Sequence, residues 1–334
     1  MGRPLEKALW VVRDRITSAK AIEDLLADAV ERGIRDLVVQ VRGRGDAYYR
    51  SSLEPRAETI ADPDLDPLGK LVRDAAVVGV RIHAWGNVFF VWSHPQGSLP
   101  RDPRHVVNAH PEWLLRPPVL KMDEASADPR PDGRRPNPDP TLRYLDPVGG
   151  ADWEGIYTDP AIPAVRAHTV SAFEEIVSRY PVAGFHHDYV RYPQERYATS
   201  PDDHAHVTKL VQETAARVRA ARPNVVVSAA VFPDPEVARD KVLQRWPDWA
   251  ARGWLDLVCP LAYRPETAEV ARLLRAAHAA APNTRMWGGL MGYADEPTLL
   301  RDQIGAAADA GCEGVILFAY DPARKELLDS LADA

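Results

Sequence analysis

The sequence has only two cysteines, Cys259 and Cys312, among its 334 residues. Their positions match neither a zinc-binding spacing nor a redox-active pair. Each lies in or beside an apolar run, and an unpaired cysteine in such a place behaves as a small hydrophobic residue. We therefore expect two buried thiols, with a disulfide between them as the less favoured alternative.

Long apolar runs are also missing. No run approaches the ~18 residues that predict a membrane-spanning helix. The N-terminal stretch "MGRPLEKALWVVRDRI" lacks the apolar core of about 7–15 residues that is typical of a secretory signal. No membrane span and no signal peptide are therefore expected in this chain. A removed export signal would leave no trace, so the compartment stays open.

Positive charge is not in excess either. The formal net charge is -7 and the pI is about 5.8, which gives no reason to expect nucleic acid as a partner. The first apolar run continues into "VVRDRITS", which is not a G-x-G-x-x-G loop, and no P-loop is present. The adjacent His186 and His187 point to opposite sides of a strand, so they make no metal-ligand pair. We expect neither a cofactor nor a metal.

Short apolar runs alternate with helical patterns along the chain. After the first run, Ile22, Leu25, Leu26, Ala29 and Val30 recur at helical spacing. Strand–helix alternation predicts parallel strands joined by crossovers, and eight such units favour a (β/α)8 TIM barrel over an open doubly wound sheet. The eight runs cover residues 8–12, 36–41, 80–86, 184–188, 224–232, 255–263, 284–292 and 314–320.

Helices are expected before and after the fourth of these runs. A helix that has Pro163 near its first turn precedes it. Further helical stretches are expected over about 204–221 and 236–252. We assign residues 1–334 to a single barrel domain.

The alternation breaks once, between residues 91 and 164. This stretch is rich in Pro, Asp and Arg and shows no periodicity. Long aperiodic loops are usually functional or disordered. Because it follows the third strand, on the side where barrels build their active sites, we interpret it as a long Pro-rich insertion near the cleft mouth. An insertion without function is the alternative.

The carboxyl ends of the predicted strands carry aromatic, amide and charged side chains. Chemistry in barrels collects at this end. Aromatic rings pack on the apolar faces of sugars, whereas carboxylates and amides accept hydrogen bonds from hydroxyl groups. Although Trp85 or Trp287 alone would more often be core, their shared location with the others favours a polyol-binding cleft. The candidates are Arg42, Asp46, Tyr48, Trp85, Asn87, Asp188, Asp234, Tyr263, Trp287, Tyr320 and Asp321.

The fourth strand carries the densest group, "GFHHDYVRYP" from residue 184 to residue 193. Residues two apart share a face, so His186 faces the barrel mouth if Asp188 does, while Phe185 and His187 face the helices. His186 either binds substrate or has a structural role. Arg191 is the nearest cation, and it binds substrate, pairs with a carboxylate or forms a surface ion pair.

This segment resembles the signature G-[IF]-H-x-D-Y-x-R-Y-P of the glycosyl-hydrolase-like family 10 proteins. "QVRGRGDAYYRSSLEP", "HAWGN", "YLDP" and "LDLVCPLAY" resemble further segments of that family in the same order. The similarity extends from Ala8 to about Tyr320 and is weakest over residues 121–140. It implies a TIM barrel that hydrolyses glycosidic bonds, with bacterial envelope glycans among the substrates and a cell-envelope or secreted location.

Two related barrel groups point to the same carboxylate. In the α-amylase family, the motif G-F-R-x-D carries the nucleophile; Gly184, Phe185 and Asp188 match it, and His186 replaces the arginine. In the chitinase-like family, D-G-x-D-x-D-x-E ends in the catalytic acid, and Val190 occupies that position here. The comparison leaves the role of Asp188 open between general acid and nucleophile.

Glycoside hydrolysis usually needs a second carboxylate. We rank Asp321 and Asp46 slightly ahead of Glu154 and Asp234. The sequence thus predicts a glycosidase that acts on a bacterial polysaccharide, either of the peptidoglycan type or another amino-sugar glycan. One alternative is a non-catalytic carbohydrate-binding protein on the same barrel, and another is a barrel enzyme that acts on a different neutral substrate.

Overall fold

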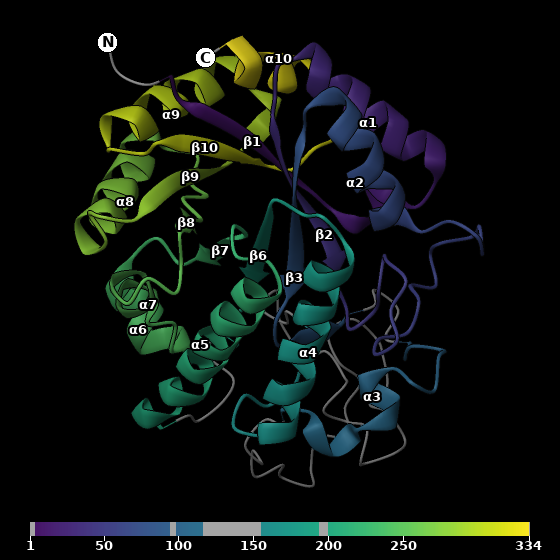
Figure 1. Cartoon of the computed structure of the whole chain (residues 1–334). Coiled ribbons are helices and arrows are strands. Elements are labelled where there is room, and N and C mark those ends of the chain that lie inside the picture. The colour runs from purple at the N-terminus through teal and green to yellow at the C-terminus, as the bar shows by residue number, and fades with distance from the viewer. Residues whose placement is uncertain (1–3, 94–97, 116–154, 194–199, 334) are drawn as a thin grey trace, which may run out of the picture.

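The computed structural model describes residues 4–93, 98–115, 155–193 and 200–333. Eight parallel strands close into a barrel in the order β1-β10-β9-β8-β7-β6-β3-β2, as the alternation of apolar runs and helical patterns predicts (Figure 1). These strands are β1 (Glu6–Val11), β2 (Asp36–Arg42), β3 (Arg81–Asn87), β6 (Gly184–Asp188), β7 (Val226–Val231), β8 (Leu257–Pro260), β9 (Arg285–Met291) and β10 (Gly314–Phe318).

Helices surround this barrel on the outside (Figure 1). The longer ones are α1 (Ala19–Glu31), α2 (Pro67–Val78), α4 (Pro163–Arg179), α5 (His204–Ala221), α8 (Thr267–Ala280), α9 (Pro297–Asp309) and α10 (Lys325–Asp333). The shorter ones are α3 (Val106–Ala109), α6 (Pro235–Val242) and α7 (Trp246–Ala251), with 3-10 turns at Arg13–Ile16, Pro111–Trp113, Pro201–Asp203 and Tyr293–Asp295.

The apolar pattern explains how helices and strands pack. In α1, the side chains of Ile22, Leu25 and Leu26 are buried, whereas Val30 is 40% exposed. All seven residues of β2 are buried, as expected for a parallel strand that is covered on one face by helices and on the other by the barrel interior. The Ser18 and Asp66 side chains accept hydrogen bonds from the first turns of α1 and α2, so both helices begin at a capped position.

One predicted helix is two helices in the structure. The sequence pattern predicts a single helical stretch over 236–252, but α6 ends at Val242 and α7 begins at Trp246. Leu243 adopts a left-handed backbone conformation with a φ of 55°, which ends α6. The break lets the buried Gln244 side chain turn inward, where it accepts a hydrogen bond from the backbone N–H of Phe232 at 2.8 Å.

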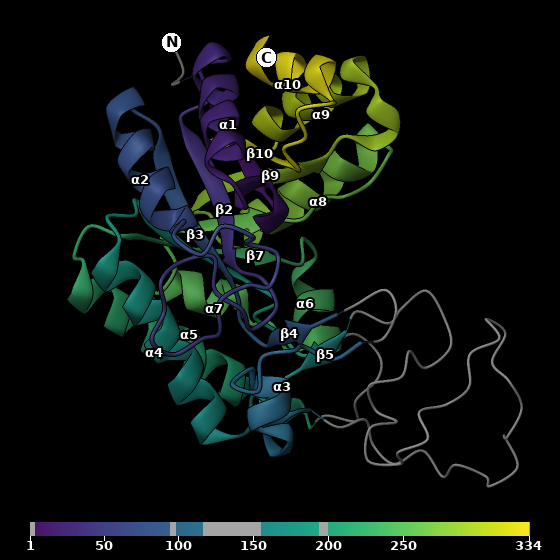
Figure 2. The ribbon, with the colours of Figure 1, turned by 90° about the vertical axis from the view of Figure 1, so that its right-hand side faces the viewer.

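A separate two-stranded antiparallel sheet follows β3. It pairs β4 (Phe90–Trp92) with β5 (Ile156–Tyr157), and neither strand is among the eight runs predicted from the sequence. This small sheet and α3 lie close together beyond the barrel strands (Figure 2). Residues 116–154 lie outside the described part of the chain, so the functional insertion over 91–164 stays a prediction.

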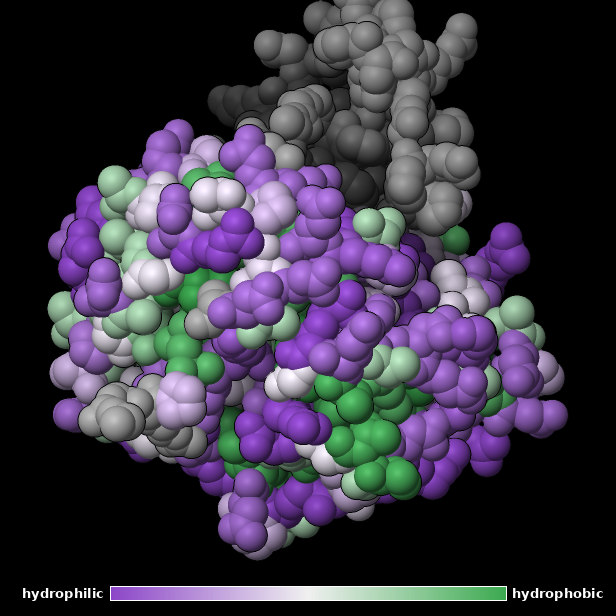
Figure 3. All heavy atoms as spheres, turned by 90° about the horizontal axis from the view of Figure 1, so that it is seen from above, coloured by the Kyte–Doolittle hydropathy of each residue, from purple (hydrophilic) through white to green (hydrophobic). Residues whose placement is uncertain are grey.

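Both cysteines are buried and free, so the alternative of a disulfide between them is wrong. Within the described residues, no helix is long and apolar enough to cross a membrane. The face on the side of α9, α10 and α1 is largely hydrophilic with small apolar areas (Figure 3). Exposed large hydrophobic side chains of the described part are Val30, Leu53, Val77, Val78, Leu99 and Val237.

Candidate active site

A cavity of about 150 Å³ opens at the carboxyl-terminal end of the barrel. Aromatic side chains form most of its wall, and one carboxylate and one guanidinium group contribute the formal charges. Six of the eight barrel strands, or the turns that follow them, contribute to the wall. The lining residues are Trp10, Trp85, Asp188, Tyr189, Arg191, Ala230, Phe232, Gln244, Leu261, Tyr263 and Phe318.

Asp188 ends β6 and is partly buried at the cavity. Its backbone oxygen accepts a hydrogen bond from Val88 N–H at 2.8 Å, which ties it to the end of β3. Its Oδ1 accepts a hydrogen bond from Tyr189 N–H at 2.7 Å. Tyr189 has a φ of 51°, a left-handed conformation that is costly for a tyrosine and is retained only where neighbours enforce it. The turn therefore fixes both the carboxylate and the following aromatic ring.

The indole of Trp10 lies across the cavity floor. Its ring centroid is 6.2 Å from that of Tyr263 and 6.3 Å from that of Phe318, both in edge-to-face arrangements. Gly289 makes room for it, because a Cβ at that position would lie 3.0 Å from Trp10 Cη2. Trp85 adds a second indole, held by a hydrogen bond from Nε1 to Asn87 Oδ1 at 2.9 Å. Together these rings present an apolar surface of the kind that packs against a sugar ring.

His186 lies beneath this floor rather than in the cavity wall. It is fully buried, and Trp10 Nε1–H donates a hydrogen bond to His186 Nε2 at 3.3 Å. Because an indole nitrogen only donates, the neutral imidazole carries its proton on Nδ1, which lies 2.9 Å from Ser228 Oγ. Burial, together with the neighbouring His187 and His83, holds the pKa of His186 well below its ordinary value. The ring is thus a neutral support for Trp10.

His187 points to the other side of β6, as strand alternation predicts. Its ring packs edge-on against Phe185 and Phe173, with centroid distances of 5.1 and 6.0 Å. Nδ1–H donates to Ser228 O at 3.0 Å, and burial lowers the pKa of His187 to about 4. This histidine therefore belongs to the packing between the barrel and α4.

Tyr263 and Gln244 contribute polar groups to the cavity wall. Burial and the charge of Asp188 hold the pKa of Tyr263 well above its ordinary value, so its phenol keeps its proton. Gln244 donates a hydrogen bond from Nε2 to Ala230 O at 3.3 Å, in addition to its bond with the backbone of Phe232. Tyr263 therefore offers a hydroxyl beside the carboxylate, and Gln244 braces the wall formed by the end of β7.

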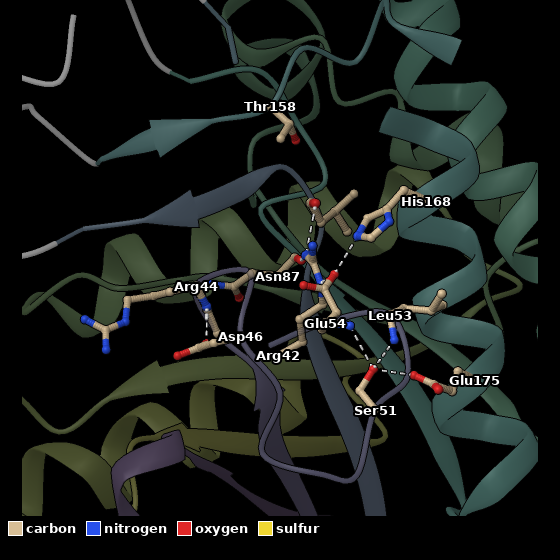
Figure 4. Close-up of polar contacts among 12 residues, drawn as sticks. Arg42, Arg44, Asp46, Ser51, Leu53, Glu54, Asn87, Thr158, His168 and Glu175 are labelled. Carbon is tan, nitrogen blue, oxygen red and sulfur yellow. Dashed lines mark hydrogen bonds and ion pairs between the residues drawn. The ribbon is translucent and has the colours of Figure 1, made fainter. Parts of the chain in front are cut away.

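Arg42 lies behind the cavity wall and does not line it. It is 1% exposed, forms an ion pair with Glu54 at 2.8 Å, and donates a hydrogen bond to Asn87 O at 2.5 Å (Figure 4). His168 of α4 contacts the same Glu54 Oε1 at 3.0 Å. Burial raises the pKa of Glu54, but Arg42 and His168 outweigh it and lower that pKa to about 2. Asn87 is equally buried; its Nδ2 donates a hydrogen bond to Gly43 O, and its Oδ1 accepts one from the Trp85 indole. Arg42 and Asn87, which the sequence predicts as substrate contacts, thus support the cavity wall from behind.

The other candidate carboxylates do not line the cavity. Asp46 is 4% exposed and accepts a hydrogen bond from Arg44 N–H at 3.0 Å (Figure 4). Asp321 pairs with Arg15 at 3.3 Å and accepts a bond from Ala323 N–H at 3.0 Å. Asp234 caps α6, accepting bonds from the N–H groups of two residues of its first turn. Glu154 lies outside the described residues.

Three aromatic candidates also point away from the cavity. The Tyr48 hydroxyl lies 2.7 Å from Thr59 Oγ1, and the Tyr320 hydroxyl donates to Asp28 of α1 at 2.7 Å. Trp287 is the third residue of β9 and hydrogen-bonds Glu6 Oε2 at 2.9 Å, near the start of β1. The prediction that Trp287 lies at the cleft end is therefore wrong, because β9 continues for four more residues to Met291.

Other lining residues are not among the predicted site residues. Trp10 lies in the first apolar run, and alternation along that strand was the signal that could have placed it inward. Alternation could likewise have placed Phe232 and Phe318 inward, at the ends of β7 and β10. Gln244 had no comparable signal, because it depends on the break between α6 and α7. Among the described residues, no group of three or more His, Cys, Asp or Glu side chains is arranged to hold a metal ion.

Comparison with known proteins gives a family match within this chain. Residues 145–286 match the model of the family described as Glycosyl hydrolase-like 10. The chain is 21% identical to the glycosyl hydrolase YngK of Bacillus subtilis, over 72% of this chain and 48% of that protein. It is 24% identical to the glycosyl hydrolase DigH of Escherichia coli, over 78% of this chain and 61% of that protein. The chain thus spans about half to three fifths of these relatives.

Solved structures give the fold. The α-L-fucosidase isoenzyme 2 of Paenibacillus thiaminolyticus superposes with a TM-score of 0.66 at 13% identity, covering 99% of this chain and 49% of that one. The endo-β-1,4-mannanase of Thermotoga petrophila superposes with a TM-score of 0.61 at 11% identity, covering 98% and 76%. Residues 145–286 thus match the Glycosyl hydrolase-like 10 family, to which the motifs of the sequence are similar, and the described part of the chain has a TIM-barrel fold.

Proposed function

We propose that this protein hydrolyses glycosidic bonds, with Asp188 as a carboxylate of the reaction. The observation that carries the proposal is the position of Asp188: among the described residues, its carboxylate is the one that lines the cavity. Aromatic rings surround it, and the phenol of Tyr263 lies in the same wall. Carboxylates that act on sugars work in such a setting, where rings position the substrate and exclude water.

The substrate we propose is a bacterial polysaccharide, either a peptidoglycan-type strand or another amino-sugar glycan. The match to Glycosyl hydrolase-like 10 and the names of the two bacterial relatives support hydrolysis of a glycan. The narrower substrate class is what the resemblance of residues 184–193 to that family implies. The aromatic floor made by Trp10 and the wall made by Trp85 and Tyr263 suit a ring with one apolar face.

The role of Asp188 is either general acid or nucleophile, and its distance from the second carboxylate would indicate the stereochemical outcome. Asp46, Asp234 and Asp321 are each held by other contacts outside the cavity wall. Glu154 is the remaining candidate and lies outside the described residues. A separation of about 5–5.5 Å from Asp188 would indicate retention of configuration, and about 6.5–9.5 Å would indicate inversion.

A non-catalytic carbohydrate-binding protein is the second candidate. The observation that favours it is the single carboxylate in the described part of the cavity wall, because most glycosidases use two. The two functions differ in one measurable property: only the enzyme produces new reducing ends from a polymer.

The deciding experiment incubates the purified protein with peptide-free peptidoglycan, intact peptidoglycan, chitin and partly deacetylated glucosamine polymers, and then quantifies reducing ends. Asp188→Asn keeps the size of the side chain but removes its titratable oxygen. We expect turnover to fall by roughly 10²-fold or more, the usual scale for loss of an acid–base group, while calorimetry still detects binding.

Asp321→Asn and, on α9, the exposed Asp302→Asn serve as comparison variants, because neither side chain lines the cavity. We expect near wild-type turnover for both. An unchanged rate in Asp188→Asn would remove Asp188 from the mechanism. Saturable binding without reducing ends from any polymer would establish the carbohydrate-binding protein instead.

A further inference from the structure

Three hydrogen bonds connect a partly exposed arginine to an indole of the cavity wall. Arg13, in the 3-10 turn after β1, donates from Nη1 to Gln40 Oε1 at 2.6 Å. Gln40 Nε2 donates to Asn87 Oδ1 at 3.3 Å, and the same oxygen accepts a hydrogen bond from Trp85 Nε1–H at 2.9 Å. Two amide side chains therefore separate Arg13 from a ring that lines the cavity.

The order of donors and acceptors along these bonds favours one orientation of each amide. A guanidinium group only donates, so Arg13 turns the oxygen of the Gln40 amide toward itself and leaves the NH2 group to face Asn87. If Gln40 turned over, its Oε1 would face Asn87 Oδ1, and two acceptors would repel each other. If Asn87 turned over in response, its Nδ2 would leave Gly43 O, to which it donates at 2.6 Å, and would meet the N–H of Trp85. The donor at Arg13 thus affects the partner that Trp85 finds.

The two amides lie in the interior of the barrel. Gln40 is 3% exposed and Asn87 is 1% exposed. Gln40 shares its face of β2 with Val38, which belongs to the apolar cluster of Trp10 and Trp85. Burial of amides is costly unless their hydrogen bonds are made, and apolar side chains would fill the same space without that cost. What the amides add is a fixed direction for the N–H of Trp85.

Arg13 makes this contact and no ion pair. Among the described residues, no carboxylate pairs with Arg13, whereas Arg15 in the same turn pairs with Asp321 at 3.3 Å. Gly43 gives Arg13 its place, because a Cβ at that position would lie 2.6 Å from Arg13 Cδ and 3.0 Å from its Nη1. The backbone after β2 therefore leaves room for this arginine.

We propose that Arg13 is a positioning residue of the cavity. Through Gln40 and Asn87, it holds the Trp85 indole in the orientation that a bound sugar ring meets. Arg13 does not itself line the cavity, so it acts through the wall and not by contact with the ligand. The orientation of Trp85 is a property of the protein alone, whereas its effect on a ligand rests on the proposed function.

A purely structural role for Arg13 makes a different prediction. If Arg13 only satisfied the buried oxygen of Gln40, its loss would lower stability and leave the Trp85 ring where it is. If Arg13 positions the indole, its loss changes the surroundings of Trp85 in the folded protein, before any ligand is added.

The first test observes Trp85 without a ligand. The full chain, which has nine tryptophans, is labelled with fluorotryptophan, and Trp85→Phe identifies the Trp85 signal in the fluorine NMR spectrum. Arg13→Met removes the donor but keeps an unbranched side chain. We expect the Trp85 signal to shift or split, while the signal of Trp287, identified in the same way, stays in place.

Three further variants separate the contact from the charge. Gly43→Ala keeps Arg13 but displaces it, because the new Cβ would collide with its side chain, and should change the Trp85 signal in the same way. Arg13→Lys keeps a donor and should restore most of the original spectrum. Arg15→Gln is the matched control, since it alters an arginine of the same turn that does not contact Gln40. Thermal melting shows which variants fold, and Gly43→Ala answers the question if Arg13→Met does not.

The second test measures affinity. Calorimetry with peptide-free peptidoglycan strands should show binding to Arg13→Met about 5- to 10-fold weaker, the scale for loss of one hydrogen bond in a buried network. Binding to Arg15→Gln should be unchanged. In the Trp85→Phe background, which lacks the indole N–H, Arg13→Met should cause little further loss, because the two residues act in series.

An unchanged Trp85 signal in both Arg13→Met and Gly43→Ala would overturn the inference. So would a loss of affinity in Arg15→Gln as large as that in Arg13→Met. A lower melting temperature with the Trp85 signal in place would leave Arg13 a structural role alone. The absence of binding and of reducing ends would defeat the proposed function, whereas a shifted Trp85 signal would still support the positioning of the indole by Arg13.

Discussion

At the amino-terminal end of the barrel, Trp287 donates a hydrogen bond to Glu6 at 2.9 Å, and Glu6 also pairs with Arg285 at 2.6 Å. Asp36 there accepts bonds from Arg81 at 2.7 Å and His83 at 3.0 Å. At the carboxyl-terminal end, the same residue types face a cavity.

The contrast lies in what surrounds similar side chains. Charged and aromatic groups at the amino-terminal end satisfy one another, and the Trp287 ring packs edge-on against His83 with centroids 5.9 Å apart. Trp85, Asp188 and Arg191 instead border open space. Residue type at a strand end therefore does not identify a binding site. At the amino-terminal end of the barrel, charged and aromatic side chains of the same types are held in ion pairs and hydrogen bonds with one another.

The largest effect should come from the tryptophan at the closed end. Trp287→Ala removes a side chain that is 2% exposed, so we expect the free energy of unfolding to fall by about 3–5 kcal/mol. Ligand affinity should remain unchanged in the folded fraction, because Trp287 does not line the cavity. Chemical denaturation measures the first quantity and calorimetry the second.

Trp85→Ala is the partner variant at the open end. Trp85 is also largely buried, at 4% exposure, but it lines the cavity. We expect it to lose both stability and affinity. An affinity loss in Trp287→Ala as large as that in Trp85→Ala would erase the distinction between the two ends.

Acid should weaken the packing outside the barrel strands before it reaches the buried ion pair. The pKa of His187 is about 4 in the native protein and about 6.5 in an unfolded chain. Between these values the unfolded state binds more protons than the native state, so stability falls as the pH falls from about 6.5 to 4, and His187 alone accounts for about 3 kcal/mol of that loss. Urea denaturation across this range, compared with His187→Asn, measures the contribution.

The buried pair behind the wall should respond at lower pH. The pKa of Glu54 is about 2 in the native protein, against an ordinary value of 4.5. Its contribution is therefore present above about pH 4.5 and is lost as the pH falls toward 2.

For the histidine, a His187→Asn variant that loses stability as steeply as the unaltered protein between pH 6.5 and 4 would contradict the assignment to His187.

The smallest effects should come from two hydroxyl groups near the same barrel end. Tyr263→Phe removes a phenol from the cavity wall, so we expect affinity to weaken by about 1 kcal/mol with little change in melting temperature. Tyr320→Phe removes the bond to Asp28, so we expect stability to fall by about 1 kcal/mol with affinity unchanged. Calorimetry and thermal melting on both variants give the comparison, and a reversed pattern would mean that the two side chains are misassigned.

The barrel itself could be predicted from the sequence. Apolar runs such as residues 36–41 and 255–263 alternate with helical patterns, and parallel strands buried on both faces require this composition. Once the strands were assigned, chain direction alone placed Asp188 and Tyr263 at the same end, because all strands in the barrel run parallel. Alternation also placed Phe185 and His187 toward the helices.

Strand boundaries and chain breaks are not determined by the local sequence pattern. The pattern "TRMWGGLMG" places Trp287 at the cleft wrongly, because apolar residues and glycines continue past the tryptophan and leave the end of β9 undefined. Gln244 was missed because the helical pattern continues through Leu243, whereas the structure ends α6 there in a left-handed conformation. Local propensity does not determine such a break, since tertiary packing overrides it.

The sequence by itself determined the fold class, the direction of each strand and the carboxylate at the end of the fourth barrel strand. Only the tertiary structure decided which side chains face open space. Arg42 meets Glu54 twelve positions along the chain and, through it, His168 on α4; Tyr320 meets Asp28 of the first helix. Contacts such as these form only when the chain folds. A polar side chain that finds a buried charge or hydrogen-bond partner in the folded protein points toward that partner and does not line the cavity.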